Sequence, residues 1–159
     1  MVSWSKWYHH VLGNPDSIDA VIEACTWYER EIEEAVKELE TDGVNIEALE
    51  LKIPGLLAHR FNQLQEIEGI FKVVEHREDI LKSKHFRNFT EHYARTLSDR
   101  TAEKYAEGMT DVNEWRACRL HVSHIRNLYL GYMKGLESLN FRISDVVKLR
   151  IAGIEDSTL

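Results

Sequence analysis

The sequence contains no uncharged run of about 18 residues, so it offers no segment suited to a membrane-spanning helix. Its first residues, MVSWSKWYHH, also lack the apolar run of a secretory signal. The only cysteines, Cys25 and Cys118, each fall on an apolar stripe, which favours buried free thiols over a disulfide. We therefore expect a soluble protein of the cytoplasm that has no membrane partner.

The motifs of common catalytic and cofactor sites are missing as well. The chain has no phosphate-binding glycine loop, no nucleophile elbow and no paired cysteine motif. Cys118, His121 and His124 lie close together in the chain, but on a helix the outer two point about 120° apart and do not close around one metal ion. The Glu-x-x-His pairs of carboxylate-bridged metal centres are not found either. We therefore expect neither enzyme activity nor a cofactor or metal site.

Signals for β-strands are absent, since no segment alternates polar and apolar residues over a sustained length. Apolar residues instead recur every three or four positions, which predicts an all-α helical bundle of three long helices plus a short C-terminal helix. The 159 residues fit a single domain, 1–159, long enough to bury about two-thirds of its unfolded surface. The predicted segments are an aromatic N-terminal segment at 1–13, an acidic helix at 14–42, a long helix at 54–97, a short helix at 99–107, a long helix at 111–138 and a C-terminal helix at 144–152.

Capping residues and prolines mark the ends of these segments. Asn14 followed by Pro15 is typical of a helix start, and Pro54 marks the start of the next long helix after a connector at 45–53. Asp111 and Glu114 have the spacing of a capping box. The segment 1–13 is too aromatic for a disordered tail, so we expect it to dock on the core or on a neighbouring subunit. The other predicted boundaries are Gly43, Leu97, Gly108, the turn at Asn140–Phe141 and the cap Ser144.

Acidic and basic residues are segregated along the chain, whose formal net charge is −7. The segment 14–50 holds twelve acids against two bases, whereas 116–150 holds seven bases against two acids. In the acidic helix the apolar residues form a narrow heptad seam flanked by glutamates, which fits either an ordinary bundle helix or a contact between subunits. The candidate oligomerisation residues on this seam and on the C-terminal helix are Ile18, Val21, Ile32, Leu39, Val147 and Ile151.

A basic and aromatic stretch from Lys82 to Lys104 contrasts with the acidity of the whole chain. Between Lys82 and Arg100 there are five Lys or Arg residues against two acids, and aromatic rings lie among them. This combination suits single-stranded DNA, because cations contact phosphates and rings stack on bases. The alternative is a helix whose apolar face belongs to the core and whose basic face is only solvated. The candidate DNA-binding residues are Lys82, Lys84, Arg87, Arg95, Phe86, Phe89 and Tyr93.

From about Gln65 onward the pattern resembles the phage recombination mediator family known as UvsY. The matching features are the basic and aromatic run from Lys82 to Arg95, the polar break and long helix that follow it, and the tail GLESLNFRISDVVKLR. The resemblance implies a ring-forming homo-oligomer in the host cytoplasm that binds single-stranded DNA. It also implies a role in loading a RecA-like recombinase onto strands covered by single-strand-binding protein. The equivalent DNA contacts fall on Lys82, Lys84 and Arg87, with Arg95 beside them.

Two other functions stay open at this point. A structural or packaging component of a phage particle, such as a head-tail connector part or a small terminase subunit, is also a small, acidic, helical chain that forms rings. A helical adaptor of the cytoplasm is the third interpretation. Exposure of Lys82, Lys84 and Arg87 on one rim would favour the mediator, whereas burial against residues 31–40 of a neighbour would favour the particle component.

Overall fold

The computed structural model describes residues 4–40, 43, 45–93 and 95–153. Every regular element within these ranges is a helix and none is a strand, so the predicted all-α class is confirmed. In chain order the elements are α1 (Lys6–Gly13), α2 (Ile18–Ala35), the short 3₁₀ helix η1 (Val36–Leu39), α3 (Ile46–Glu91), α4 (Asp99–Glu107) and α5 (Thr110–Ile151).

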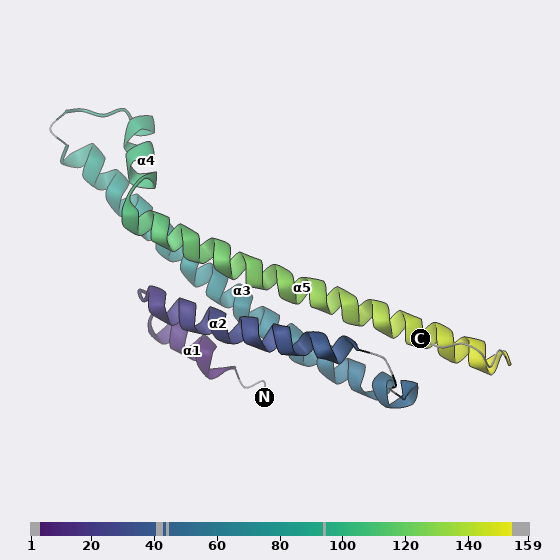
Figure 1. Ribbon diagram of the computed structural model, residues 1–159. Coiled ribbons are helices and arrows are strands. Elements are labelled where there is room, and N and C mark those ends of the chain that lie inside the picture. Colours follow the sequence, from purple (N-terminus) through teal and green to yellow (C-terminus); the bar gives the residue numbers. More distant parts are fainter. Residues whose placement is uncertain (1–3, 41–42, 44, 94, 154–159) are drawn as a thin grey trace.

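Two long antiparallel helices, α3 and α5, form the frame of the molecule (Figure 1). At 1.5 Å per residue, the 46 residues of α3 span about 69 Å and the 42 residues of α5 span about 63 Å. The short helix α4 connects them at one end of this hairpin, and α2 lies along its side with α1 next to α2. α4 and the end of α5 therefore occupy opposite ends of an elongated molecule.

The core follows the helical spacing of apolar residues. Along α5 the buried side chains recur every three or four positions from Val112 to Val146, and they meet buried stripes of α2 and α3. Tyr28, Ile67 and Tyr129 are each at most 1% exposed in this main cluster. A second cluster joins the start of α3 to the end of α5, and its members are Ile46, Leu49, Ile53, Leu139, Ile143 and Val146.

This second cluster explains why α5 is one helix where two were predicted. The predicted turn at Asn140–Phe141 and the predicted cap Ser144 are wrong, since α5 continues to Ile151. Leu139 and Ile143 keep the buried spacing of α5 and pack against the first turns of α3. Burial across the hairpin outweighs the local turn signal, so the predicted helices 111–138 and 144–152 are a single element.

Helix α3 both begins and ends before its predicted limits. Its N-cap is Asn45, whose side chain accepts a hydrogen bond of 2.9 Å from the backbone N–H of Glu47. Pro54 lies inside the helix and removes one backbone hydrogen bond, but the neighbouring Ile53 is fully buried and holds this segment on α5. The helix therefore spans 46–91 in place of 54–97, whereas α4 has the range predicted for the short helix, 99–107.

The aromatic N-terminal segment contains α1, which packs on the chain's own core. Ser5 caps the start of α1 and Asn14 lies at its end, so the prediction of Asn14 as the cap of the acidic helix is wrong. Ser17 has that role, because its hydroxyl accepts an N–H from the first turn of α2. Tyr8 lies against Gly69 of α3, where an added Cβ atom would come within 2.7 Å of the tyrosine ring. Gly69 thus makes room for α1.

A buried carboxylate joins the N-terminal segment to two helices. Glu66 of α3 is only 4% exposed, and it accepts a hydrogen bond of 2.6 Å from the backbone N–H of Ser5. Its second oxygen accepts a hydrogen bond from the Tyr28 hydroxyl of α2. Burial, together with this bond to Glu66, raises the pKa of Tyr28. The carboxylate is therefore satisfied by one partner from the N-terminal segment and one from α2.

The apolar seam of α2 is buried within the chain. Val21 and Ile32 are at most 4% exposed, and Ile18 and Leu39 pack against the same core. Val21 and Ile32 therefore have little surface left for another subunit, whereas Ile18 and Leu39 are only half-buried, and the contact between subunits stays a prediction. The acidic helix is α-helical only to Ala35 and continues to position 39 as η1. Positions 41 and 42, where it was predicted to end, lie outside the described residues.

Both cysteines are buried free thiols, as predicted. The pKa of the Cys25 thiol is raised to about 12, mainly because the thiol is buried. The neighbouring Cys118 also raises this pKa. At neutral pH Cys25 is therefore protonated and acts as a small apolar side chain of the core.

Candidate nucleic-acid interface

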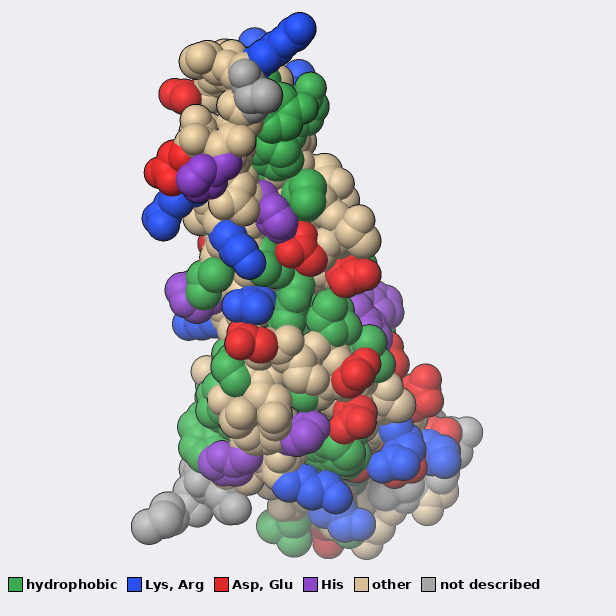
Figure 2. Space-filling view, turned by 90° about the vertical axis from the view of Figure 1, so that its left-hand side faces the viewer, with side chains coloured by type: hydrophobic (Ala, Val, Ile, Leu, Met, Phe, Trp, Pro, Cys, Tyr) green, Lys and Arg blue, Asp and Glu red, His purple; other side chains and the backbone are tan. Residues whose placement is uncertain are grey.

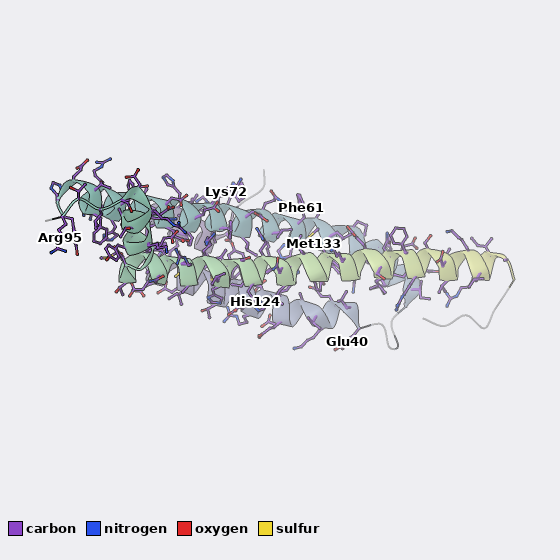
Figure 3. The ribbon with its side chains drawn as sticks, turned by 90° about the horizontal axis from the view of Figure 1, so that it is seen from above. Glu40, Phe61, Lys72, Arg95, His124 and Met133 are labelled. Atoms are coloured by element: carbon purple, nitrogen blue, oxygen red, sulfur yellow. The ribbon has the colours of Figure 1, made fainter. Side chains whose placement is uncertain are left out.

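The predicted DNA-binding residues lie at the end of the hairpin that carries α4. We call this region the tip and define it as α3 from Lys82 to Glu91, the described residues among 92–98, and α4. Figure 3 places Arg95 at this far end of the molecule, well away from Glu40, which follows the acidic helix. The far end of the acidic segment is therefore well separated from the basic stretch.

Five cations at the tip face solvent. Lys84, Arg87 and Arg95 are exposed, and so are Arg100 and Lys104 of α4. Within the part of the chain that the structure describes, none of the five forms an ion pair. Their charges are therefore available to an anionic ligand.

Lys82 differs from these five cations because α4 holds it. Its Nζ atom lies 2.7 Å from an Oε1 atom of Glu107 and 4.0 Å from Oε1 of Glu103. The hydrogen bond to Glu107 is the main cause that raises the pKa of Lys82. In this conformation Lys82 is therefore already in an ion pair, unlike Lys84 and Arg87, which were predicted to contact DNA together with it.

Three aromatic rings meet where α3 ends and α4 folds back. The ring centroid of Phe89 lies 5.9 Å from that of Tyr93 and 5.6 Å from that of Tyr105, and the two tyrosines are 6.4 Å apart. Tyr93 is 51% exposed and Tyr105 is 47% exposed, whereas Phe89 is half-buried beneath them. The exposed tyrosine faces suit stacking on unpaired bases.

A cleft of about 690 Å³ separates α3 from α4. Phe86, which is half-buried, forms part of its wall, and the cleft contains both cations and carboxylates. A second hollow of about 510 Å³ lies along α3, and Arg87 lines both spaces. Figure 2 shows the side of the molecule that carries the tip, with Lys and Arg side chains spread among hydrophobic ones and acids between them. The charged residues that line the first cleft are Lys82, Arg87, Glu91, Asp99, Arg100 and Glu103.

Below the tip the charges of α3 and α5 are largely paired with one another. Nε of Arg116 lies 3.1 Å and Nε of Arg119 lies 2.8 Å from the carboxylate of Glu78, a residue that is 6% exposed. The basic residues that α5 contributes here are therefore used to neutralise α3 and not to form a second cationic surface.

Asp111 has a role other than the predicted capping box. The N-cap of α5 is Met109, without a side-chain cap, and the Asp111 carboxylate lies 2.9 Å from Nε2 of His85 on α3. The bond to His85 is the main cause that lowers the pKa of Asp111, and the backbone N–H of Val112 adds to it. This contact fastens the start of α5 to α3 next to α4.

The opposite end of the molecule carries exposed apolar side chains. Leu51 is 84% exposed, Phe141 72% and Ile151 82%, while Val147 is half-buried against the second cluster. Of the predicted oligomerisation residues, Ile151 is thus the one whose side chain is largely available to another molecule. Leu51 and Phe141 were not predicted, because both fall in segments that were read as connectors or turns.

The candidate DNA-binding residues included none from α4, although the basic and aromatic stretch extends to Lys104 and Tyr105 follows it. The placement of Tyr105 beside Phe89 depends on the chain folding back after α3, and no local pattern encodes that. The described residues include no group of acidic, histidine or cysteine side chains that could hold a metal ion.

No protein-family model, curated protein or solved structure was found to match this chain. Among the described residues, no helix combines the length and the hydropathy that crossing a bilayer requires.

Proposed function

We propose that this protein binds single-stranded DNA through the tip and acts as a recombination mediator. In this role it helps a RecA-like recombinase to load onto DNA covered by single-strand-binding protein. The observation that carries the DNA-binding part is a set of exposed cations, without ion pairs to any described residue, together with two exposed tyrosine rings, Tyr93 and Tyr105. The recombinase part rests on the resemblance of the sequence pattern to the UvsY family.

A single strand suits the tip better than a duplex does. Stacking on Tyr93 and Tyr105 requires a base whose face is free, and a duplex keeps its base faces covered. Lys84, Arg87 and Arg95 contribute contacts to phosphates, which are independent of sequence. The formal net charge of −7 opposes indiscriminate binding, so we expect DNA to be held only where cations are concentrated.

Simultaneous replacement of Lys84, Arg87 and Arg95 by alanine is expected to weaken binding to a labelled poly-dT oligonucleotide roughly 100-fold near 0.1 M salt. Each lost phosphate contact lowers the slope of log K against log salt by about 0.7 for a single strand, so the slope should fall by about 2. Fluorescence anisotropy titrations at several salt concentrations measure both quantities.

The matched control removes three cations elsewhere. Lys52, Lys72 and Lys134 are exposed and form no ion pair within the described residues, and Figure 3 shows Lys72 well away from Arg95. Alanine at these three positions makes the same change in net charge and should leave binding within about threefold of the wild type. Equal losses in both variants, or binding that does not respond to salt, would contradict a site at the tip.

The proposal includes assembly into a homo-oligomeric ring, in which several weak tips bind one strand together. The exposed apolar side chains of Leu51, Phe141 and Ile151 support a contact between subunits, because all three lie in the part of α3 and α5 at this end of the molecule and leave large apolar surfaces in solvent. This end lies away from the tip, so assembly there leaves the cations free for DNA.

Phe141→Asp is expected to reduce the assembly to the 18.6 kDa single chain, because a carboxylate buried in an apolar contact has no partner there. Light scattering after size-exclusion chromatography measures the mass. Leu120→Asp is the control, since Leu120 is 64% exposed on α5 at some distance from this end. A wild-type protein that is a single chain at micromolar concentration would remove assembly from the proposal.

A ring-forming component of a phage particle is the second candidate, and the same exposed apolar end favours it. In that role the basic tip contacts the glutamate-rich helix of a neighbouring subunit. Assembly without any binding of poly-dT would make this candidate the leading one.

A further inference from the structure

The contact between Lys82 and α4 has the form of an internal competitor for the DNA site. Glu103 and Glu107 are four residues apart on α4, so they share one face of the helix, and that face is turned toward Lys82. Both carboxylates remain partly exposed, at 59% and 42%. They place negative oxygens beside the Lys82 ammonium group, where a phosphate would otherwise bind.

The position of α4 is set by a small apolar contact. Ala102 and Ala106 are fully buried, and Tyr105 packs against Phe89 of α3. α4 has nine residues, and its contacts with the rest of the chain are made mainly with α3. A helix this short, held by two alanines and one ring, is suited to shift when a ligand competes for its ionic contact.

We propose that Glu103 and Glu107 withhold Lys82 from DNA in the wild-type protein, and that release of Lys82 from these carboxylates adds it to the binding surface of Lys84 and Arg87. The inference rests on the proposed DNA-binding function and assigns α4 a regulatory part in it. A partly exposed ion pair is weak, so neutralising the two carboxylates is enough to free Lys82 for a phosphodiester chain already held by Arg87. Affinity is then set by the balance between the carboxylates of α4 and the strand.

The double variant Glu103→Gln and Glu107→Gln tests this arrangement. With Lys82 released, the variant is expected to bind labelled poly-dT about fivefold more tightly near 0.1 M salt, and the salt slope should steepen by about 0.7, as one added phosphate contact requires. Lys82→Ala in the otherwise wild-type protein should change the affinity by less than about twofold, because Lys82 is already paired. Both are measured by fluorescence anisotropy with the full chain.

Loss of negative charge alone would also tighten binding, so a triple variant separates the two causes. Lys82→Ala combined with both glutamine changes should return the affinity to the wild-type value if the gain acts through Lys82. A gain that survives in the triple variant would overturn the inference. So would a loss in Lys82→Ala as large as that in Arg87→Ala, since Lys82 would then be in contact with DNA already.

Two further controls complete the test. Glu33→Gln with Glu34→Gln makes the same change in net charge on the exposed face of α2, and it should leave the affinity unchanged. Circular dichroism of each variant checks that the helical content is retained. If the wild type binds and the Glu103/Glu107 variant binds no better, only the competition is overturned. If neither the wild type nor the Glu103/Glu107 variant binds, both the competition and the proposed DNA-binding function are overturned. Binding by the Glu103/Glu107 variant but not by the wild type supports the competition.

Discussion

Replacing Tyr129 by alanine is expected to lower the free energy of unfolding by about 4 kcal/mol. Tyr129 is fully buried in the main cluster, and its ring packs edge-on against that of Tyr28, with the centroids 6.3 Å apart. Side chains of α2, α3 and α5 all belong to this cluster, so no single helix can move to close the resulting cavity. Chemical denaturation followed by circular dichroism should show a lower midpoint at an unchanged slope.

Tyr129→Phe is the matched control, since it keeps the ring and removes only the hydroxyl group. That hydroxyl donates a hydrogen bond of 3.1 Å to the backbone carbonyl of Tyr28. The expected loss is about 1 kcal/mol, because a single neutral hydrogen bond is removed and no charge is left unpaired. A phenylalanine variant as unstable as the alanine variant would show that the hydroxyl, and not the volume of the ring, dominates at this position.

Replacing Arg60 by methionine is expected to cost about 3 kcal/mol of stability. Arg60 is 5% exposed, and its guanidinium group lies 2.8 Å from Oε1 of Glu38, 2.8 Å from Oε1 of Gln63 and 3.7 Å from Oε2 of Glu31. Methionine fills a similar space but leaves both glutamates without a counter-charge. This cost lies at the lower end of the range for breaking a buried ion pair. The side chains of Glu31 and Glu38 are 27% and 29% exposed, so water screens part of their charge.

A triple variant separates the unpaired charges from the lost packing. Arg60→Met together with Glu31→Gln and Glu38→Gln removes all three charges, and it should recover more than half of the lost stability. The amide oxygen of glutamine can still accept the hydrogen bond that Tyr132 donates to Glu38. If the triple variant is no more stable than Arg60→Met alone, loss of packing around Arg60 is the cause and the electrostatic explanation is wrong.

The candidate site could be predicted from the sequence only in part. The basic and aromatic stretch indicated Lys84, Arg87, Arg95 and Tyr93, and the structure exposes all four at the tip. It also indicated Lys82, which α4 holds through Glu107. Composition shows how many cations a segment has, but whether each is free depends on the acids that the fold brings to it.

The helical class and the positions of most helical segments were determined by the sequence alone. Their cause is local, because the three-and-four spacing of apolar residues acts within a few turns along the chain. Only the tertiary structure decided that α3 runs through Pro54 and that α5 runs through Ser144, since these continuations depend on burial across the hairpin. It also decided that the seam of α2 is core and that Lys82 is paired, because the partners involved come together only when distant parts of the chain pack.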